Sequence, residues 1–155
     1  MLLLLDIDGV MVQAKSWTSP SLLSDGFSAF SLQATNTLKK LLSNDDVTVI
    51  LTTSHKSRYS IEEWKELFFQ RGINILKLDK LPEYKIGRNR KEEILNWVNT
   101  TVVNEEFVIL DDDSSLNDLP PQLKKHLVLT SPIIGLTENH LTEIKTILKG
   151  SVHNL

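Results

Sequence analysis

The stretch Leu-Leu-Leu-Leu-Asp-Ile-Asp-Gly-Val at residues 2–10 decides the fold of this chain. Its apolar run is typical of a β-strand that is buried on both faces. Side chains alternate across a strand, so we expect Asp6 and Asp8 to point to one side and Ile7 to the other. Gly9 frees the backbone to turn sharply after them. Two carboxylates this close repel each other unless a cation or a shared proton relieves them. The stretch therefore predicts a divalent-cation site with acid–base or nucleophilic chemistry.

Length and composition narrow the class of protein. A chain of 155 residues is expected to form one domain, spanning 1–155. The net charge of −3 gives no whole-chain electrostatic reason to expect nucleic-acid binding. The absence of cysteine excludes disulfides, thiolate catalysis and Cys-ligated zinc. The opening leucine run is too short to span a bilayer and lacks the features of a signal peptide, so we expect a cytoplasmic protein with no membrane partner.

Strand-like and helix-like segments alternate along the rest of the chain. Apolar runs predict further strands at 47–51, 73–78, 107–110 and 127–129. Helical spacing and capping residues predict helices over 34–42, from Ser60 to Gly72, after Asn89, and from Thr137 to Gly150. This alternation predicts an α/β fold, a three-layer, Rossmann-like, doubly wound arrangement around a mainly parallel five-stranded sheet.

Polar residues follow three of these strands at the point where each strand ends. Asp6 and Asp8 follow the first strand, Thr52 follows the second, and the triplet 111–113 follows the fourth. In such sheets ligands bind in the crevice beyond the carboxyl ends of the strands. We therefore expect acidic groups far apart in the sequence to converge around one divalent ion, although the triplet alone would also suit a solvated acidic turn.

The order of these motifs resembles the haloacid dehalogenase (HAD) superfamily of phosphohydrolases. The shared order is Asp-x-Asp-Gly-Val at 6–10, a strand that ends in threonine, a lysine that opens a helix, and a strand that ends in two aspartates. The strings LTTSHK (51–56), ILDDDSSL (109–116) and IIGLT (133–137) also resemble the small HAD domains associated with Swiss Army Knife RNA-repair proteins. The resemblance implies a HAD-like fold and a Mg²⁺-dependent phosphatase that acts through an aspartyl-phosphate intermediate.

In this resemblance the aspartates carry the chemistry and the metal. Asp6 would be the nucleophile that attacks phosphorus, and Asp8 would protonate the leaving oxygen and then activate water. Mg²⁺ takes oxygen ligands, which Asp6, the backbone carbonyl of Asp8 and a carboxylate of the triplet would supply. For that last ligand we favour Asp112, with Asp111 as the alternative one residue earlier.

Two threonines and a glycine are the candidates for contact with the substrate. Thr52 would hydrogen-bond a phosphoryl oxygen, and Thr53 competes with it by register. Gly9, at the turn after the first strand, would border the bound phosphate. His55 follows at the mouth of the predicted crevice, where we favour a solvated loop histidine over a substrate contact.

The resemblance also requires a cation at the start of a helix. Lys91 would neutralise the charge on the phosphate and on Asp6. A cation in the first turn of a helix opposes the helix dipole, and local rules tend to break at functional sites. Lys85 and Arg90 are the alternatives.

Segment lengths leave no room for a cap domain. HAD caps are inserted after the first strand or between the second strand and the lysine motif. Here residues 11–31 are too few for more than a flap, and the second interval holds only the helix and strand that the core requires. An open site suits a large phosphorylated substrate that itself shields the reaction. A nucleic-acid end is the most specific hypothesis, with the acidic net charge mildly against it, and no partner protein is indicated.

The competing interpretation is a non-catalytic binding module that keeps the HAD fold, or a receiver-like phospho-acceptor. A receiver also has acidic residues after its first strand, a threonine and a lysine. Its acidic pair, however, precedes a phosphorylated aspartate on a later strand. Here the Asp-x-Asp pair ends the first strand and aspartates recur after the fourth, so the order favours the phosphatase.

Overall fold

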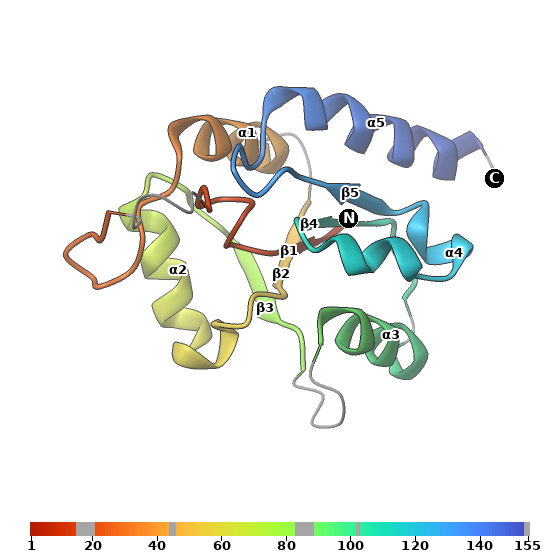
Figure 1. Ribbon diagram of the computed structural model, residues 1–155, viewed down its shortest axis with the longest axis horizontal. Coiled ribbons are helices and arrows are strands. Elements are labelled where there is room, and N and C mark those ends of the chain that lie inside the picture. Colours follow the sequence, from red (N-terminus) through yellow and green to blue (C-terminus); the bar gives the residue numbers. More distant parts are fainter. Residues whose placement is uncertain (15–20, 44–45, 83–88, 102, 154–155) are drawn as a thin grey trace.

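Five parallel strands form the centre of the computed structural model, which describes residues 1–14, 21–43, 46–82, 89–101 and 103–153 (Figure 1). Their order across the sheet is β3-β2-β1-β4-β5. The strands are β1 (Leu2–Leu5), β2 (Thr48–Leu51), β3 (Lys77–Lys80), β4 (Phe107–Asp111) and β5 (Leu127–Leu129). Because the chain reverses its direction of winding at β1, the crevice expected of a doubly wound sheet lies at the carboxyl end of this central strand.

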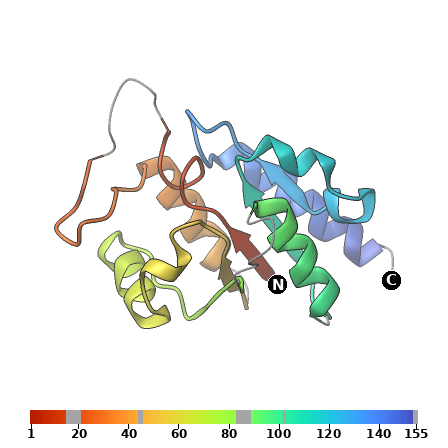
Figure 2. The same ribbon diagram turned by 60° about the horizontal axis from the view of Figure 1, so that its bottom comes forward.

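Helices cover both faces of the sheet. One face carries α1 (Leu32–Ser43), α2 (Ile61–Gln70) and α5 (Glu138–His153). The other carries α3 (Arg90–Thr100), the 3-10 helix η2 (Ser114–Asp118) and α4 (Pro121–Lys124). Figure 1 shows α1 beside α5 with α3 across the sheet from them, and Figure 2 brings α3 to the front beside η2. The predicted three-layer α/β fold is confirmed.

The opening leucine run is apolar throughout because both of its faces are covered. Leu3 and Leu5 belong to the apolar cluster under α1, α2 and α5. Leu4 belongs to the cluster under α3, η2 and α4. All three are fully buried, as expected for a central strand of a parallel sheet.

Two predicted elements have a boundary that differs from the structure by three residues or more. The third strand was expected from 73 to 78, but the ladder with β2 runs over Lys77–Lys80. Ile73 and Ile75 are buried before that ladder begins, so their apolar character reflects packing against the core and not strand pairing. The last helix continues past Gly150 to His153, since one glycine in a helix costs only about 1 kcal/mol.

The intervals where a cap domain could be inserted contain little structure of their own. Between β1 and α1, the described residues form isolated bridges such as Leu22 with Ser28. Between β2 and α3, the described chain holds the 3-10 helix η1 (Lys56–Arg58), α2 and β3. The described residues therefore include no cap domain, and none of their helices is long and apolar enough to cross a lipid bilayer.

Candidate active site

Three polar side chains lie level with one another across the three central strands. Leu5 of β1 pairs with Leu51 of β2 and with Leu110 of β4. The next residue of each strand is Asp6, Thr52 or Asp111. The residues two positions earlier, Leu4, Ile50 and Ile109, all lie in the apolar cluster under α3. Because side chains alternate along a strand, Asp6, Thr52 and Asp111 face the same layer, at the carboxyl ends of their strands.

Three carboxylates converge at this edge of the sheet. One oxygen of each of Asp6, Asp111 and Asp112 lies within 4.8 Å of the others. Burial raises the pKa of Asp6 to about 6, and burial together with the charge of Asp6 raises that of Asp111 to about 7. The neighbouring Asp112 carboxyl also raises the pKa of Asp6. Three carboxylates that repel one another offer oxygen ligands to a divalent cation. This suits Mg²⁺, which binds carboxylates, phosphate and water.

Among the described residues, Arg90 is the cation that contacts these carboxylates. Its Nη1 lies 2.5 Å from Asp111 Oδ2 and 3.3 Å from Asp6 Oδ2. Burial disfavours the charged guanidinium, but the neighbouring Asp111 and Asp6 outweigh that effect and raise the pKa of Arg90 above its usual range. Arg90 is the first residue of α3, where the helix dipole opposes a cation, so the two carboxylates are what hold it there.

The predicted Lys91 takes a different position. It directly follows Arg90 in the helix, and successive helical side chains point in different directions. Arg90 shares a face with the buried Ile94 and Trp97, four and seven residues later, and this spacing was visible in the sequence. Lys91 is not among the described residues that line the acidic cleft, and Lys85, the other alternative, lies outside the described residues.

The carboxylates open into a cleft of about 450 Å³. Its described lining comprises Asp6, Asp8, Ser54, Arg90, Asp111, Asp112, Asp113 and Ser114. The side chain of Asp8 is 55% exposed there, whereas that of Asp6 is 6% exposed. The Asp-x-Asp pair therefore supplies one buried and one accessible carboxylate to the same cleft.

The two threonines after β2 differ in their hydrogen bonds. The hydroxyl oxygen of Thr52 is buried without a hydrogen-bond partner among the described residues. The hydroxyl oxygen of Thr53 accepts a hydrogen bond from the backbone N–H of His55 (3.2 Å). Buried polar groups are nearly always paired, so the hydroxyl of Thr52 is the one of the two that needs a ligand.

Gly9 sits where no other residue fits without rearrangement. Its φ is +82°, in the left-handed region that favours glycine. A Cβ on Gly9 would lie 2.0 Å from Asp112 Oδ2. The Gly9 carbonyl accepts a hydrogen bond from the Thr130 hydroxyl (2.7 Å), which follows β5. Gly9 therefore lets the turn after β1 approach the acidic residues after β4.

Two contacts in this arrangement were not predicted from the sequence, which placed His55 at the mouth of the crevice and favoured a solvated loop histidine there. His55 Nε2 lies 2.9 Å from Asp8 Oδ2. Lys56 is 5% exposed and forms an ion pair with Glu93 of α3 (2.9 Å), which ties η1 to the helix that carries Arg90. Lys56 and Glu93 are distant in sequence and lie in segments whose spacing gives no sign of pairing, so only the folded chain identifies the contact.

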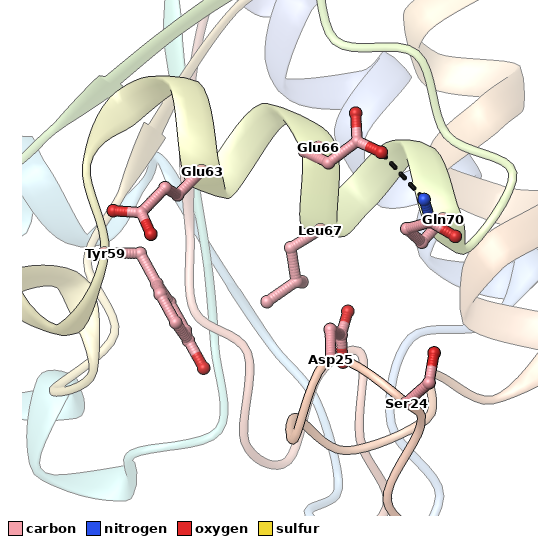
Figure 3. Close-up of a pocket in the computed structure, with 7 residues that line it drawn as sticks. All are labelled: Ser24, Asp25, Tyr59, Glu63, Glu66, Leu67 and Gln70. Atoms are coloured by element: carbon pink, nitrogen blue, oxygen red, sulfur yellow. Dashed lines mark hydrogen bonds between the residues drawn. The ribbon is translucent and has the colours of Figure 1, made fainter.

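A second cavity has a volume of about 370 Å³, and Figure 3 draws the residues that line it. It is formed by α2 and the loop before α1, and Tyr59 and Leu67 contribute to its wall. Two of its carboxylates already have partners: Glu66 accepts a hydrogen bond from Gln70 (2.7 Å), and Asp25 pairs with Arg71 (2.6 Å). It shares no described residue with the acidic cleft. The carboxylates and Arg90 meet in the cleft at the strand ends, which is therefore the candidate active site.

The parallel sheet and the paired acidic motifs on adjacent strands define a HAD-type domain. The comparison with protein families agrees: the model described as the HAD domain in Swiss Army Knife RNA repair proteins matches residues 2–141. The chain belongs to this family, and membership supports a hydrolase of the phosphatase type as its general class. The comparisons with curated proteins and with solved structures found no match. HAD domains generally use Mg²⁺, and the acidic cluster is compatible with that ion.

Replacing Gly9 by alanine should disrupt the acidic cluster. The added Cβ would displace Asp112 and force a positive φ on a residue that resists it, at a cost of about 1–3 kcal/mol. The matched control is Gly72→Ala, because Gly72 has a φ of +83° and nothing within 4 Å of the added atom. Chemical denaturation should show a loss of stability in both variants, while Mg²⁺-induced stabilisation should be lost only in Gly9→Ala. Equal Mg²⁺ responses in the two would contradict the close approach of Gly9 to Asp112.

The stabilisation by Mg²⁺ should increase with pH. The pKa values of Asp6 and Asp111 in the folded chain, about 6 and about 7, lie above the ordinary 3.8. The metal-free folded state therefore binds protons more tightly than the unfolded state, and these two groups lose their contribution to stability as the pH rises from about 4 to about 7. Mg²⁺ requires the deprotonated carboxylates.

Melting temperatures measured with Mg²⁺ and with EDTA should therefore differ more at about pH 8 than at about pH 5. Burial lowers the pKa of His126, so this group adds stability as the pH rises, opposite to the two aspartates. The melting temperatures with Mg²⁺ and with EDTA should therefore be compared at the same pH. Asp111→Asn is the matched variant and should weaken the pH dependence of the Mg²⁺ effect. Identical Mg²⁺ shifts at both pH values would count against the carboxylate cluster as the metal site.

Proposed function

We propose that this protein is a Mg²⁺-dependent phosphatase that forms an aspartyl-phosphate on Asp6. The observation that carries the proposal is the convergence of Asp6, Asp111, Asp112 and Arg90 at the carboxyl ends of adjacent strands. Next to them lies the buried hydroxyl of Thr52, which has no hydrogen-bond partner among the described residues. Together these groups supply a nucleophile, and donors that can stabilise negative charge on a phosphoryl group.

Hydrogen bonds within the acidic triplet favour Asp112 over Asp111 as the second carboxylate ligand. Asp111 Oδ2 pairs with Arg90, and Asp111 Oδ1 accepts the backbone N–H of Asp113 (3.0 Å). The Asp112 carboxylate has fewer such partners among the described residues than that of Asp111, and it lies close to Gly9. Asp6, Asp112 and the backbone carbonyl of Asp8 would hold Mg²⁺, which when bound neutralises charge on the phosphate and orients it.

In the proposed mechanism each of these side chains has one role. Asp6 attacks phosphorus, a bond forms between its carboxylate and phosphorus, and the bond to the leaving oxygen breaks. Asp8, the accessible carboxyl of the pair, donates its proton to that oxygen. In the second half Asp8 takes a proton from water as the water attacks phosphorus, which releases Asp6. Thr52 donates a hydrogen bond to a phosphoryl oxygen, and Arg90 stabilises negative charge on Asp6 and the phosphate.

The open cleft favours a large phosphorylated substrate. The described residues include no cap domain above the site, and the family model concerns RNA repair proteins. We therefore favour a phosphorylated nucleic-acid end. Arg90 is the one cation among the described residues that line the cleft. Contacts between the protein and the rest of the nucleic acid would therefore be made by surfaces outside the cleft.

Replacing Asp6 by asparagine should abolish turnover. Removal of the nucleophile should lower kcat by at least about a thousandfold. Phosphate release should be measured with p-nitrophenyl phosphate and with 5′- and 3′-phosphorylated oligonucleotides, each with Mg²⁺ and with EDTA. Equal rates for the two proteins would refute the role of Asp6. A single slow loss of phosphate from Asp6 without turnover would favour a phospho-acceptor module.

Replacing Arg90 should damage catalysis far more than replacing its neighbour. Arg90→Ala should remove about 2–4 kcal/mol of transition-state stabilisation, by analogy with the loss of one oxyanion donor. Lys91→Ala is the matched control and should keep kcat/KM within about threefold, because a surface lysine contributes little. Steady-state kinetics with p-nitrophenyl phosphate would compare them. A large loss in Lys91→Ala with none in Arg90→Ala would return the cation's role to Lys91.

A further inference from the structure

His55 contacts the accessible carboxylate of the cleft from outside the metal cluster. Its Nε2 lies 2.9 Å from Asp8 Oδ2. The other oxygen, Oδ1, has no partner among the residues that the structure describes. A carboxylate that is 55% exposed on a turn would otherwise rotate freely, so this hydrogen bond fixes which oxygen faces the imidazole and which faces the cleft.

The imidazole is itself held in place by the surrounding chain. The His55 backbone N–H donates to Thr53 Oγ1 (3.2 Å), and its carbonyl accepts from the backbone N–H of Arg58 (2.8 Å). The ring meets Phe27 edge to face, with ring centroids 5.6 Å apart. Phe27 is 3% exposed, and its own carbonyl accepts a hydrogen bond from Arg71 (3.1 Å). His55 is therefore positioned from two sides before it meets Asp8.

We propose that His55 is a positioning residue that holds Asp8 Oδ2 and thereby presents Oδ1 to the leaving group of the substrate. The inference rests on the phosphatase function proposed above and adds a residue to it. When Asp8 is protonated on Oδ1, the Nε2–H of His55 donates to Oδ2 and the proton on Oδ1 points into the cleft. As the bond between phosphorus and the leaving oxygen breaks, that proton moves to the leaving oxygen. His55 neither gains nor loses a proton in this step.

This role predicts that the effect of losing His55 depends on the leaving group of the substrate. General-acid catalysis matters most when the leaving group is basic, because an acidic leaving group departs without a proton. Loss of His55 should therefore hardly affect p-nitrophenyl phosphate and should slow substrates with more basic leaving groups. A role in folding or in phosphate binding would slow all substrates alike.

The experiment measures kcat/KM for a series of substituted phenyl phosphates with wild type, His55→Ala and His55→Gln. The ratio kcat/KM reports every step up to departure of the leaving group. We expect a steeper dependence on leaving-group pKa in His55→Ala, with about a tenfold loss or more at the basic end, since general acids contribute about 10²–10⁴-fold. His55→Gln, whose amide N–H can replace Nε2–H, should restore most of the slope. His126→Ala, a histidine before β5 at the opposite end of the sheet, should keep the wild-type slope.

A second measurement tests the contact without turnover. Two-bond ¹H–¹⁵N spectra of the imidazoles in wild type and Asp8→Ala should show that His55 loses its fixed Nε2–H tautomer when Asp8 is removed. Parallel slopes for wild type and His55→Ala, or unchanged His55 signals in Asp8→Ala, would overturn this inference alone. A wild-type protein that releases no phosphate would overturn the proposed function, and the role of His55 with it.

Discussion

The ion pairing of Arg90 with Asp111 and Asp6 is the interaction on which the candidate site depends. Two buried carboxylates on neighbouring strands repel each other, and each costs on the order of several kcal/mol to remove from water. Arg90 lies 2.5 Å from one and 3.3 Å from the other, so a single guanidinium offsets both. Both contacts are made by the same nitrogen, Nη1, which carries two N–H donors. The same charges that make the cluster unfavourable alone make it suitable for a divalent cation and a phosphate.

The position of Arg90 is in turn fixed by the packing of α3. Ile94 and Trp97 fasten the helix to the sheet face that also bears Leu4, Ile50 and Ile109. Glu93, one turn after Arg90, is bound by the buried Lys56 of η1. The segment after β2 and the first turn of α3 are therefore coupled, and the hydroxyl of Thr52 is held level with the carboxylates by the strand register. The apolar core and the buried ion pair act together to hold a polar site rigid.

Much of this site follows from local pattern. The buried opening strand, the Asp-x-Asp-Gly motif and the aspartates after β4 predict that acidic groups meet at one edge of a parallel sheet, and Asp6, Asp111 and Asp112 do meet there. Period-2 alternation explains why the strands end with their polar side chains on the α3 face. The third strand was placed too early because Ile73 and Ile75 are buried by packing against the core, and an apolar run does not distinguish that from pairing.

The sequence by itself determined the α/β class, the buried opening strand and the acidic pair, since these depend on alternation and burial within a few consecutive residues. Only the tertiary structure decided that the hydroxyl of Thr52, and not that of Thr53, lacks a partner among the described residues, and that His55 reaches Asp8. It also brought Arg90, and not Lys91, to the carboxylates, a choice that the helical spacing to Ile94 and Trp97 indicated. Each of these choices is a matter of one residue or of one side-chain direction. Such choices are set by how a helix or loop is rotated against the sheet, and that rotation comes from packing between segments far apart in the chain.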